Sequence, residues 1–397
     1  MTKAIVIGGG IAGCSTAYAL ARRGIAVTLI ERHSALAQEG SGNPIAMLYP
    51  KFSAKPDAAS MLVLHGFRFT LDLLNQLPSN QILFNACGLI QLAFDAREQA
   101  RQQALLQQDP LAFLQHLDAY SVSEKAGIEL KTGGIYLPQS GWIRPAALCK
   151  ALSSSALVTT HVSTNALKIQ KNGNQWQIFD DKNTAFEADI VVMCNANDIK
   201  QFKSCASVQI TPVRGQVNFF AQNNFSQKIQ TIICSDHYLS PAVDGLHSIG
   251  TTYAPNDTNP HLSDTDTSEN LIALRVISPD IYSHLDKNAL SGRVGWRSQT
   301  LDYMPLAGQL LDEQAIRTKP PRHNVDPADL PWLEGLYVNA GHGSKGMITA
   351  PICGELIASL ITNSSYPVES ALASKLNPSR FLLRELGLKQ LANSLYK

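Results

Sequence analysis

The sequence lacks several features that would assign it to a specialised class. Its 397 residues contain no uninterrupted apolar run of about 18 residues, so we expect no transmembrane helix and no membrane partner. The 33 Lys and Arg nearly balance the 32 Asp and Glu, so the whole chain has no charge bias toward nucleic acid. Seven cysteines occur without a C-x-x-C pair, which indicates free thiols in a reducing compartment rather than a metal site or disulfides. We therefore expect a cytoplasmic protein, and its length suggests about two domains.

What the chain does have is a glycine-rich turn close to its N-terminus. Residues 4–7 are apolar and predict a strand, while residues 14–23 predict a helix. Between them lies G-x-G-x-x-G, formed by Gly8, Gly10 and Gly13. The first glycine permits a tight turn, the second lets a pyrophosphate approach the backbone, and the third lets the helix pack closely on the strand. The N-terminus of the helix would face the phosphates with its unpaired N–H groups, next to Ile11 and Ala12 of the turn.

An acidic residue follows at the spacing that a dinucleotide site requires. Residues 27–30 predict a second strand that ends at Glu31, 18 residues after Gly13. A carboxylate at this place can accept hydrogen bonds from ribose hydroxyls, and Arg32 lies beside it. The loop that follows contains Ser41, Gly42 and Asn43, whose backbone N–H groups could reach the cofactor; the alternative is a plain surface connector. This half of the pattern does not separate FAD from NAD, and a glycine-rich turn also occurs in ordinary α/β proteins.

The middle of the chain changes from helical to strand-like patterns. Residues 157–179 predict an antiparallel meander with a hairpin turn at Asn172 and Gly173. Residues 188–197 predict a buried parallel strand whose carboxyl end, at Asn195, opens toward a ligand. Residues 212–253 predict a second β-rich region. Helices are expected at residues 60–77, 97–108, 145–152, 268–277 and 347–361.

A second glycine turn lies more than 300 residues after the first. Residues 336–340 predict a strand, and Gly341, Gly343 and Gly346 repeat the G-x-G-x-x-G spacing before a helix that begins near Met347. A domain that binds NAD has no need of this turn, whereas FAD spans both ends of its domain. We therefore expect FAD, with the helix N-terminus near the flavin ring. Ser344 belongs to the same turn; Lys345 either adds a cation there or is a solvated surface lysine. The turn at residues 301–308 and the proline-rich loop at residues 319–331 contain no glycine motif of this kind.

These motifs together resemble the D-amino-acid-oxidase (DAO) family of flavoproteins over essentially the whole chain. The segments are GGGIAG…ER, the loop SGN, RGQ at residues 214–216 and the late GHGSKG turn. Within this family, SGNPIAMLYPKFS (41–53), WRSQTLDYMPLAG (296–308), GLYVNAGHGSKGMITAPICGELIASLI (335–361) and NPSRF (377–381) resemble the flavin domain of the MnmC group of bacterial tRNA-modifying enzymes. The usual members of that group carry a methyltransferase domain ahead of the flavin domain, and this chain begins at the flavin motif. We therefore expect either a stand-alone oxidase or a relative with a different secondary amine, and the methylation step is not assigned to it.

The resemblance implies an α/β fold in which a Rossmann-type FAD-binding domain carries an inserted, mostly antiparallel α+β substrate domain. Its expected limits are residues 1–85, 140–211 and 292–397 for the FAD domain, and 86–139 and 212–291 for the substrate domain. Ser298 occupies the place where some relatives carry a flavin-linking cysteine, so FAD is expected to be non-covalent. The expected cofactor residues are Gly8, Gly10, Ile11, Ala12, Gly13, Glu31, Arg32, Ser41, Gly42, Asn43, Val162, Asn195, Gly341, Gly343, Ser344, Lys345, Gly346 and Met347.

The activity that the resemblance implies is FAD-dependent oxidation of an N-substituted glycine. The expected substrate is 5-carboxymethylaminomethyl(-2-thio)uridine at the tRNA wobble position, whose carboxymethyl group would leave as glyoxylate. Arg297 is the first candidate for the substrate carboxylate, with a structural ion pair as its alternative role. Tyr253 and Tyr49 are weaker candidates, with a place in the core as their equal alternative, and Lys345 completes the catalytic set. Two other functions stay open: an oxidase of free glycine, sarcosine or a D-amino acid, and a flavin-binding module without turnover. The expected partners are thus tRNA or a small amino acid, with a separate methyltransferase acting afterwards.

Overall fold

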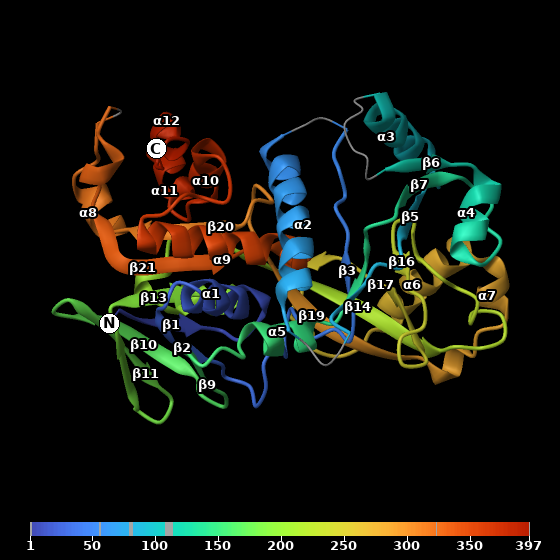
Figure 1. Cartoon of the computed structure of the whole chain (residues 1–397), viewed down its shortest axis with the longest axis horizontal. Helices are drawn as coiled ribbons and strands as arrows, with labels where there is room; N and C mark the ends of the chain where they lie inside the picture. Colours follow the sequence, from blue (N-terminus) through green and yellow to red (C-terminus); the bar gives the residue numbers. More distant parts are fainter. Residues whose placement is uncertain (1, 55–56, 79–81, 108–113, 323, 397) are drawn as a thin grey trace.

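The computed structural model describes residues 2–54, 57–78, 82–107, 114–322 and 324–396, and within them the chain forms two neighbouring β-sheet regions. Figure 1 shows one region with α1 and α9 beside the N-terminus, and the other with α3, α4, α6 and α7 at the opposite end. The long helix α2 (Ala58–Gln76) lies between them. Asp57 caps α2 by accepting a hydrogen bond from the N–H of Ser60.

The first region is built on a six-stranded sheet of the order β20-β21-β13-β1-β2-β9. The pairs of β1 with β2 and β13, of β13 with β21 and of β2 with β9 are parallel, and only β20 runs antiparallel to its neighbour β21. The central strands β1 and β13 are apolar except for Lys3 because both faces of this sheet are covered. The strands are β1 (Lys3–Ile7), β2 (Ala26–Ile30), β9 (Val158–His161), β13 (Ile190–Met193), β20 (Leu306–Leu311) and β21 (Trp332–Ala340).

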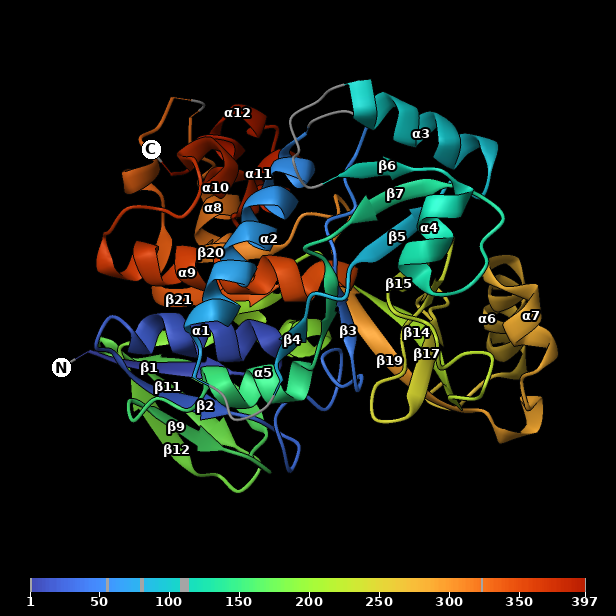
Figure 2. The same ribbon diagram turned by 45° about the vertical axis from the view of Figure 1, so that its right-hand side comes forward.

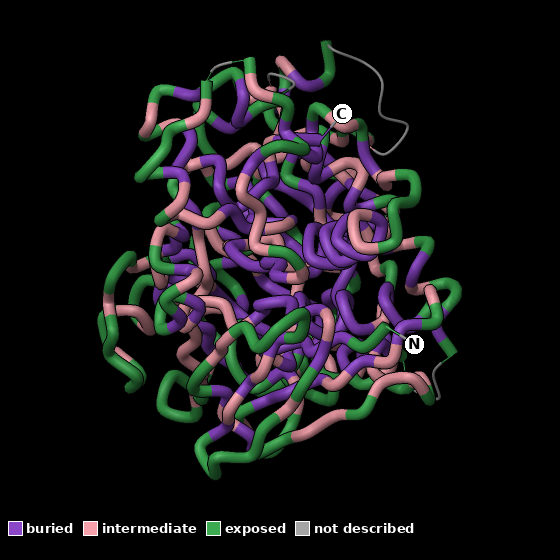
Figure 3. The backbone as a smooth tube through the Cα atoms, turned by 90° about the vertical axis from the view of Figure 1, so that its left-hand side faces the viewer, coloured by how far each residue is buried: buried purple, intermediate pink, exposed green. Residues whose placement is uncertain are grey.

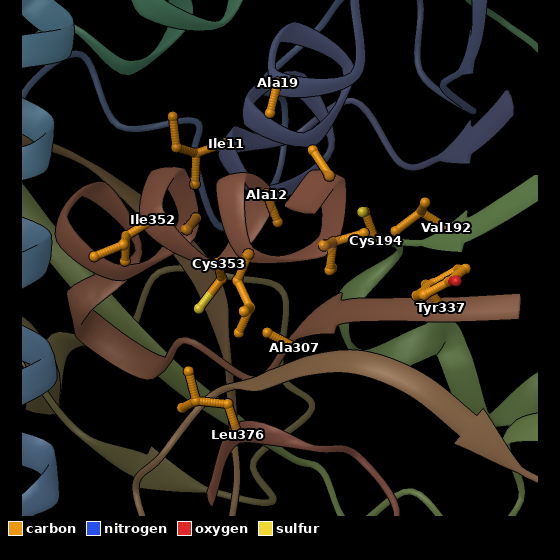
Figure 4. Close-up of a cluster of buried hydrophobic side chains, with 14 of the residues drawn as sticks. Ile11, Ala12, Ala19, Val192, Cys194, Ala307, Tyr337, Ile352, Cys353 and Leu376 are labelled. Atoms are coloured by element: carbon orange, nitrogen blue, oxygen red, sulfur yellow. The ribbon is translucent and has the colours of Figure 1, made fainter. Parts of the chain in front are cut away.

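Helices cover one face of this sheet. α1 (Ile11–Ala21) packs against α9 (Gly346–Thr362), and Gly354 permits the contact because a Cβ there would lie 3.0 Å from the backbone of Ser15. Figure 4 shows the apolar side chains of both helices converging with those of β13, β20 and β21. α2 crosses α9 in Figure 2, at Gly66, where a Cβ would lie 2.6 Å from the carbonyl oxygen of Ile348. The segment Gly343–Thr362 has the length and composition to cross a membrane, yet most of it is buried, as in a core helix.

The opposite face of the sheet is covered by a small antiparallel sheet of β10 (Ala166–Asn172), β11 (Gln175–Asp180) and β12 (Ala185–Ala188). Its hairpin turns at Gly173, whose φ of +58° favours glycine. The expected meander over residues 157–179 is therefore wrong at its start, because β9 pairs parallel with β2 in the main sheet instead of with β10. Strand direction depends on which distant strand accepts the hydrogen bonds, and periodicity does not report that.

The second region is a nine-stranded sheet, mostly antiparallel, of the order β18-β14-β17-β16-β15-β5-β7-β6, with β19 paired to β14. β14 and β19 pair antiparallel over nine residues, from Thr211 with Gln299 to Phe219 with Ser291. The strands are β5 (Leu89–Leu92), β6 (Gln115–Leu117), β7 (Gly134–Leu137), β14 (Thr211–Ala221), β15 (Ile232–Cys234), β16 (Tyr238–Leu239), β17 (Leu246–Gly250), β18 (Ala254–Pro255) and β19 (Ser291–Gln299).

Smaller elements complete and connect the two regions. β3 (Ala46–Leu48), β8 (Gly141–Ile143) and β4 (Phe84–Asn85) form a short sheet beside α5 (Pro145–Leu152). α3 (Ala96–Gln107) was expected to reach Gln108, which lies outside the described residues. The remaining helices are α4 (Ala119–Ala126), α6 (Asp264–Ile277), α7 (Pro279–Ser283), α8 (Glu313–Thr318), α10 (Ser370–Leu376), α11 (Arg380–Glu385) and α12 (Lys389–Ala392).

The fold is the expected combination of a Rossmann-type region and a mostly antiparallel α+β region. Figure 3 shows the buried residues concentrated in the interior of the molecule and the exposed residues at its periphery. One expectation near the C-terminus is wrong. The predicted turn over residues 301–308 contains the start of β20, whereas α8 lies ahead of the proline-rich loop expected over residues 319–331. The precise domain limits stay a prediction.

Candidate cofactor and substrate site

A cavity of about 690 Å³ lies between the two regions, and it is lined by the carboxyl ends of β1, β13 and β21 on one side and by β16, β17 and β19 on the other. In open parallel sheets the carboxyl ends of the strands are the usual position of ligands. Both glycine turns reach the cavity wall, so two segments more than 300 residues apart meet at one site. Gly346 faces Ile11 across the junction, where a Cβ would lie 3.5 Å from the Ile11 side chain.

The three glycines of the first turn have different surroundings. Gly8 adopts a φ of +108°, and a Cβ there would lie 2.6 Å from the carbonyl oxygen of Cys194. A Cβ at Gly13 would overlap the carbonyl oxygen of Gly8, so this glycine serves helix packing. At Gly10 a Cβ would meet only Ser41 Oγ, at 3.4 Å. Backbone atoms thus leave no room for a side chain at Gly8 and Gly13, whereas the space beside Gly10 is nearly free of protein atoms.

The N-terminus of α1 is available to an anion. Gly10 is the N-cap and supplies no side-chain hydrogen bond, and the first turn of the helix contains no acidic residue. The N–H of Ile11 donates to Ser41 Oγ at 3.0 Å, which places the loop with Ser41 directly above the helix start. Unpaired N–H groups and the positive end of the helix dipole make such a position suitable for a phosphate.

Glu31 lies buried at the end of β2, and both of its carboxylate oxygens already have a backbone partner. Oε2 accepts from the N–H of Gly9 at 2.7 Å, and Oε1 accepts from the N–H of His33 at 2.7 Å. A carboxylate has about four acceptor positions, so each oxygen can accept a further donor from the cavity. Glu31 therefore fixes the shape of the glycine turn as well as offering acceptors, a role that its spacing alone does not reveal.

Charged side chains surround the rim next to Glu31. Arg32 forms ion pairs with Glu39 and with Asp198, the latter at 3.0 Å. Burial alone would raise the pKa of Glu39, but hydrogen bonds from His33 and Arg32 hold it below its ordinary value. Arg32 is thus committed to protein carboxylates at the cavity edge.

The second glycine turn connects β21 to α9. Gly341 and Gly343 have φ values of +75° and +55°, which L side chains rarely adopt. Between them, His342 places Nδ1 2.9 Å from Thr349 Oγ1 and Nε2 3.0 Å from Asn339 Oδ1. Burial lowers the pKa of His342 to about 3, so the imidazole is neutral and acts as a structural link between the turn and α9.

Lys345 is the N-cap residue of α9, and no side chain caps that helix. Its ammonium is half-buried in the cavity wall. Burial lowers the pKa of Lys345, while the nearby Asp57 acts in the opposite direction. The structure therefore places both a cation and a helix N-terminus at this end of the cavity.

Arg297 lies on β19, in the wall opposite the glycine turns. Its guanidinium donates to the carbonyl oxygen of Thr252 at 3.1 Å and to the hydroxyl of Thr251. No carboxylate of the described residues forms an ion pair with it, so the structural ion pair considered from the sequence is not present there. Burial lowers the pKa of Arg297. A guanidinium held by neutral acceptors keeps donors free for an anion in the cavity.

Tyrosines surround the guanidinium. The Arg297 Cζ atom lies 6.0 Å from the ring centroid of Tyr253, whose hydroxyl accepts a hydrogen bond from Gln299 at 2.7 Å. Tyr49 also lines the cavity and donates to Gln91 Oε1 at 3.0 Å. Tyr238 was not among the expected residues, and burial raises its pKa.

Most of the expected cofactor residues line the cavity, but Gly13, Gly42 and Val162 do not. Val162 is 41% exposed. Gly42 lies against Arg293, whose guanidinium donates to the carbonyl oxygens of Gln38 and Glu39 and to Asn43 Oδ1. Arg293 thereby fixes the loop with Ser41 to β19.

Several wall residues carried no sequence signal that distinguishes them. They come from strands and from the segments that follow strands in both regions, where single polar residues are common and only the three-dimensional arrangement selects them. They include Lys51, Gln91, Thr164, Asn165, Asn197, Gln201, Ser235, His237, Tyr238 and Thr251.

Two glycine turns that begin helices at one cavity, with an acid at the end of the second strand, define a two-domain flavoprotein oxidoreductase. The chain belongs to the family of FAD dependent oxidoreductases (DAO), whose family model matches residues 3–360. Its cofactor is FAD, and the chain is an FAD-dependent oxidoreductase.

Curated relatives match nearly the whole of this chain. The tRNA 5-methylaminomethyl-2-thiouridine biosynthesis bifunctional protein MnmC of Methylobacillus flagellatus is 41% identical over 99% of the chain, and the protein of that name from Pseudomonas syringae pv. syringae is 39% identical over 97%. The chain covers 61% and 59% of their lengths, so it spans about three fifths of these relatives.

Solved structures share the fold at low sequence identity. Glycine oxidase from Geobacillus kaustophilus superimposes with a TM-score of 0.78 at 20% identity, covering 96% of this chain and 99% of that one. L-proline dehydrogenase from P. horikoshii gives a TM-score of 0.73 at 19% identity, covering 97% and 98%. At this identity the likeness supports the architecture only.

The residues present fit FAD at both ends of the cavity. Gly10 leaves open the space that a pyrophosphate would fill, next to the N-terminus of α1, where the N-cap residue supplies no side chain. Asn195, at the end of β13, lines the cavity, and its buried amide nitrogen and oxygen have no hydrogen-bond partner within the described part of the chain. Buried polar groups without a partner are rare in native proteins, so Asn195 is suited to a bound ligand.

Proposed function

We propose that this chain oxidises the secondary amine of 5-carboxymethylaminomethyl(-2-thio)uridine at the tRNA wobble position and releases the carboxymethyl group as glyoxylate. The observation that carries the proposal is Arg297, a guanidinium that faces a flavin-type cavity without a carboxylate partner among the described residues. An N-substituted glycine supplies a carboxylate that a guanidinium can bind through two hydrogen bonds.

The names of the relatives support the choice of amine. They refer to biosynthesis of 5-methylaminomethyl-2-thiouridine in tRNA, and the chain aligns with about three fifths of their length at up to 41% identity. Removing a carboxymethyl group leaves an aminomethyl group on the base, and that amine is one methyl short of the product in their name. A methyltransferase would therefore act next, as a separate partner of this chain or as a further part of the same protein. We place both steps in the cytoplasm, where tRNA is found.

The cavity residues have three tasks in this reaction. Arg297 holds the substrate carboxylate, Tyr49 and Tyr238 enclose the methylene carbon, and the second glycine turn with Lys345 holds the flavin end of the cofactor. FAD, when bound, accepts the hydride from that methylene carbon. The amine loses one proton, the resulting imine takes up water, and the C–N bond breaks to give glyoxylate and the primary amine. The chain thus acts mainly by orienting one C–H bond.

The cofactor is proposed to be held without a covalent bond. Ser298 lines the cavity beside Arg297, and its buried hydroxyl has no partner among the described residues. A serine hydroxyl does not form the thioether that a cysteine at this place would provide.

The test uses the FAD-loaded protein and tRNA from cells that lack this activity. After incubation, the tRNA is digested, the nucleosides are separated, and glyoxylate is measured in the same sample. We expect the carboxymethylaminomethyl nucleoside to disappear and the aminomethyl nucleoside and glyoxylate to appear in equal amounts. Arg297→Lys keeps the charge but loses the fork of donors, so its turnover should fall at least about tenfold, while its FAD content stays unchanged.

Two results would replace the proposal. If this tRNA stays unmodified while free glycine or sarcosine bleaches the flavin rapidly, the chain is an amino-acid oxidase. If no amine bleaches the flavin, the chain is a flavin-binding module without turnover.

A further inference from the structure

The ring of Tyr253 is exposed at the edge of the cavity, although its hydroxyl is fixed. The side chain is 51% exposed, and its hydroxyl accepts the hydrogen bond from Gln299 at 2.7 Å. Gln299 is itself joined to the flavin-side turn, because its backbone forms a β-bridge with His342. The tyrosine ring is therefore held in one orientation with apolar surface left uncovered.

Burial of that ring would be expected if its only role were structural. Most of the large apolar side chains that line this cavity, such as Met47 and Ile348, are buried or half-buried. An exposed aromatic ring whose position is fixed is the usual platform for an unstacked base in single-stranded RNA.

The separation between Tyr253 and Arg297 matches one substrate that touches both. The guanidinium carbon lies 6.0 Å from the centre of the tyrosine ring. In a carboxymethylaminomethyl base, four single bonds join the carboxylate carbon to the ring, a reach of about 5 Å when extended. A carboxylate bound to Arg297 therefore leaves its base within reach of the Tyr253 ring.

From this geometry we infer that Tyr253 is a specificity residue that stacks on the nucleobase of the substrate while Arg297 holds its carboxylate. The inference rests on the proposed function, and it assigns Tyr253 a binding role in place of the catalytic one expected from the sequence. It distinguishes a nucleoside substrate from a free amino acid, because only the former has a ring to stack.

The test compares two substrates on four variants of the FAD-loaded protein. One substrate is an anticodon stem-loop RNA that carries 5-carboxymethylaminomethyluridine, and the other is N-methylglycine, which has no base. Tyr253→Leu removes the ring, Tyr253→Phe removes only the hydroxyl, and Tyr253→Trp offers a larger ring. Tyr303→Leu is the matched control, since Tyr303 is 67% exposed and does not line the cavity.

We expect Tyr253→Leu to raise KM for the RNA about tenfold or more, and to change kcat/KM for N-methylglycine by less than about twofold. Tyr253→Phe and Tyr303→Leu should keep the wild-type KM for the RNA, and Tyr253→Trp should keep or lower it. If the leucine variant fails to fold, Tyr253→Gln, which also lacks a ring, takes its place in the comparison with the Phe and Trp variants.

Three results would overturn the inference. One is an unchanged KM for the RNA in Tyr253→Leu. Another is a loss in Tyr253→Phe as large as in Tyr253→Leu, which would assign the effect to the hydroxyl. The third is an equal loss with both substrates, which would make the ring part of the amine site. If wild-type protein itself leaves the RNA unmodified, the proposed function falls and the stacking role falls with it, whereas an active wild type with an unchanged leucine variant removes the stacking role alone.

Discussion

Gly10 differs from the other glycines of the first turn in what a side chain would meet. At Gly8 and Gly13 a Cβ would collide with backbone, whereas at Gly10 it would meet only Ser41 Oγ at 3.4 Å. Gly10→Val should therefore fold but block the space where the pyrophosphate approaches. We expect a colourless protein whose melting temperature, without added FAD, lies within a few degrees of the wild-type apoprotein. Full FAD occupancy in this variant would exclude the first glycine turn from the cofactor site.

Lys345 permits a prediction about the flavin end of the cavity. Lys345 is the N-cap residue of α9 and lines the cavity wall, where a positive charge would stabilise negative charge that develops on the flavin ring. Lys345→Met should lower the reduction potential of the bound FAD and slow its reduction by amine about 100-fold, with little change in FAD affinity. Stopped-flow absorbance and redox titration measure the two effects. Lys228→Met, which removes an exposed lysine away from the cavity, is the control. An unchanged reduction potential and an unchanged reduction rate in Lys345→Met would show that Lys345 is an ordinary surface lysine.

Among single residues of the site, those that belong to motifs could be predicted from the sequence. Those that hold the motifs in place could not. Gly8, Glu31 and Gly341 follow from spacing, because the backbone geometry of each turn restricts the residue type. Arg293 could not be predicted, since its three acceptors lie about 250 positions away and any arginine in a strand looks alike. The same holds for Gln91 and Tyr238, whose positions at the cavity depend on strand pairing in the second region.

Among the elements, the turn between β19 and β20 is fixed to the C-terminal helix α11 by one carboxylate. Asp302 forms ion pairs with the buried Arg380 at 2.7 Å and with Arg384 at 2.8 Å. Burial acts to raise the pKa of Asp302, but hydrogen bonds and charge from Arg380 and Arg384 outweigh it and hold the pKa at about 2. The folded-state pKa is therefore depressed below the unfolded value. This contribution to stability is present above pH 4 or so and is lost as the pH falls toward 2.

Asp302→Ala should lower the free energy of unfolding by about 3–5 kcal/mol, because it leaves the guanidinium of Arg380 buried without its carboxylate. Urea unfolding at pH 7 measures the loss. The matched control is Glu385→Gln, which removes the partner of Arg317 in an exposed ion pair and should leave stability nearly unchanged. Equal effects of the two substitutions would show that the Asp302 pair is no more than a surface contact. The difference between the variants should shrink as the pH falls toward 2, where Asp302 is protonated.

Elements with strong local signals were predictable, and those defined by distant partners were not. β1, β2 and α9 lie within one residue of their expected limits, whereas β21 begins four residues and α1 three residues before the expected start. β20 was missed because a proline and a glycine, Pro305 and Gly308, lie at its beginning and mark a turn by local rules. β21 provides the hydrogen bonds that override this signal.

Across the whole molecule, the FAD-binding region joins strands from both ends of the chain to β9 and β13 from the middle in one sheet. The two glycine turns meet because β1 and β21 both pair with β13 in parallel, so their carboxyl ends point the same way. That arrangement could be inferred from the repeat of one motif. The pairing of β14 with β19 could not be inferred, since β19 begins 80 residues after β14 and no motif specifies the register of the pair. The cavity, with Arg297 on one wall and the glycine turns on the other, depends on both.

The net charge of +1 makes salt dependence an informative measurement of the proposed substrate. A chain without overall charge bias can bind tRNA only through local contacts between Lys or Arg and phosphates, and each contact releases counterions. Logarithmic kcat/KM for tRNA should fall linearly with the logarithm of salt concentration, with a slope of about −0.7 for each phosphate contact if the contacts are to single-stranded RNA. N-methylglycine, which has no phosphate, should show a slope near zero on the same enzyme. Binding energy from remote phosphates can also be used to position the reacting bond, so the small amine should have the lower kcat at saturation. The two slopes are measured from 50 to 300 mM potassium chloride by the release of glyoxylate, with FAD content checked at each concentration.

Equal slopes for tRNA and N-methylglycine would mean that phosphate contacts contribute nothing to tRNA binding. That result would favour a free amino acid as the substrate.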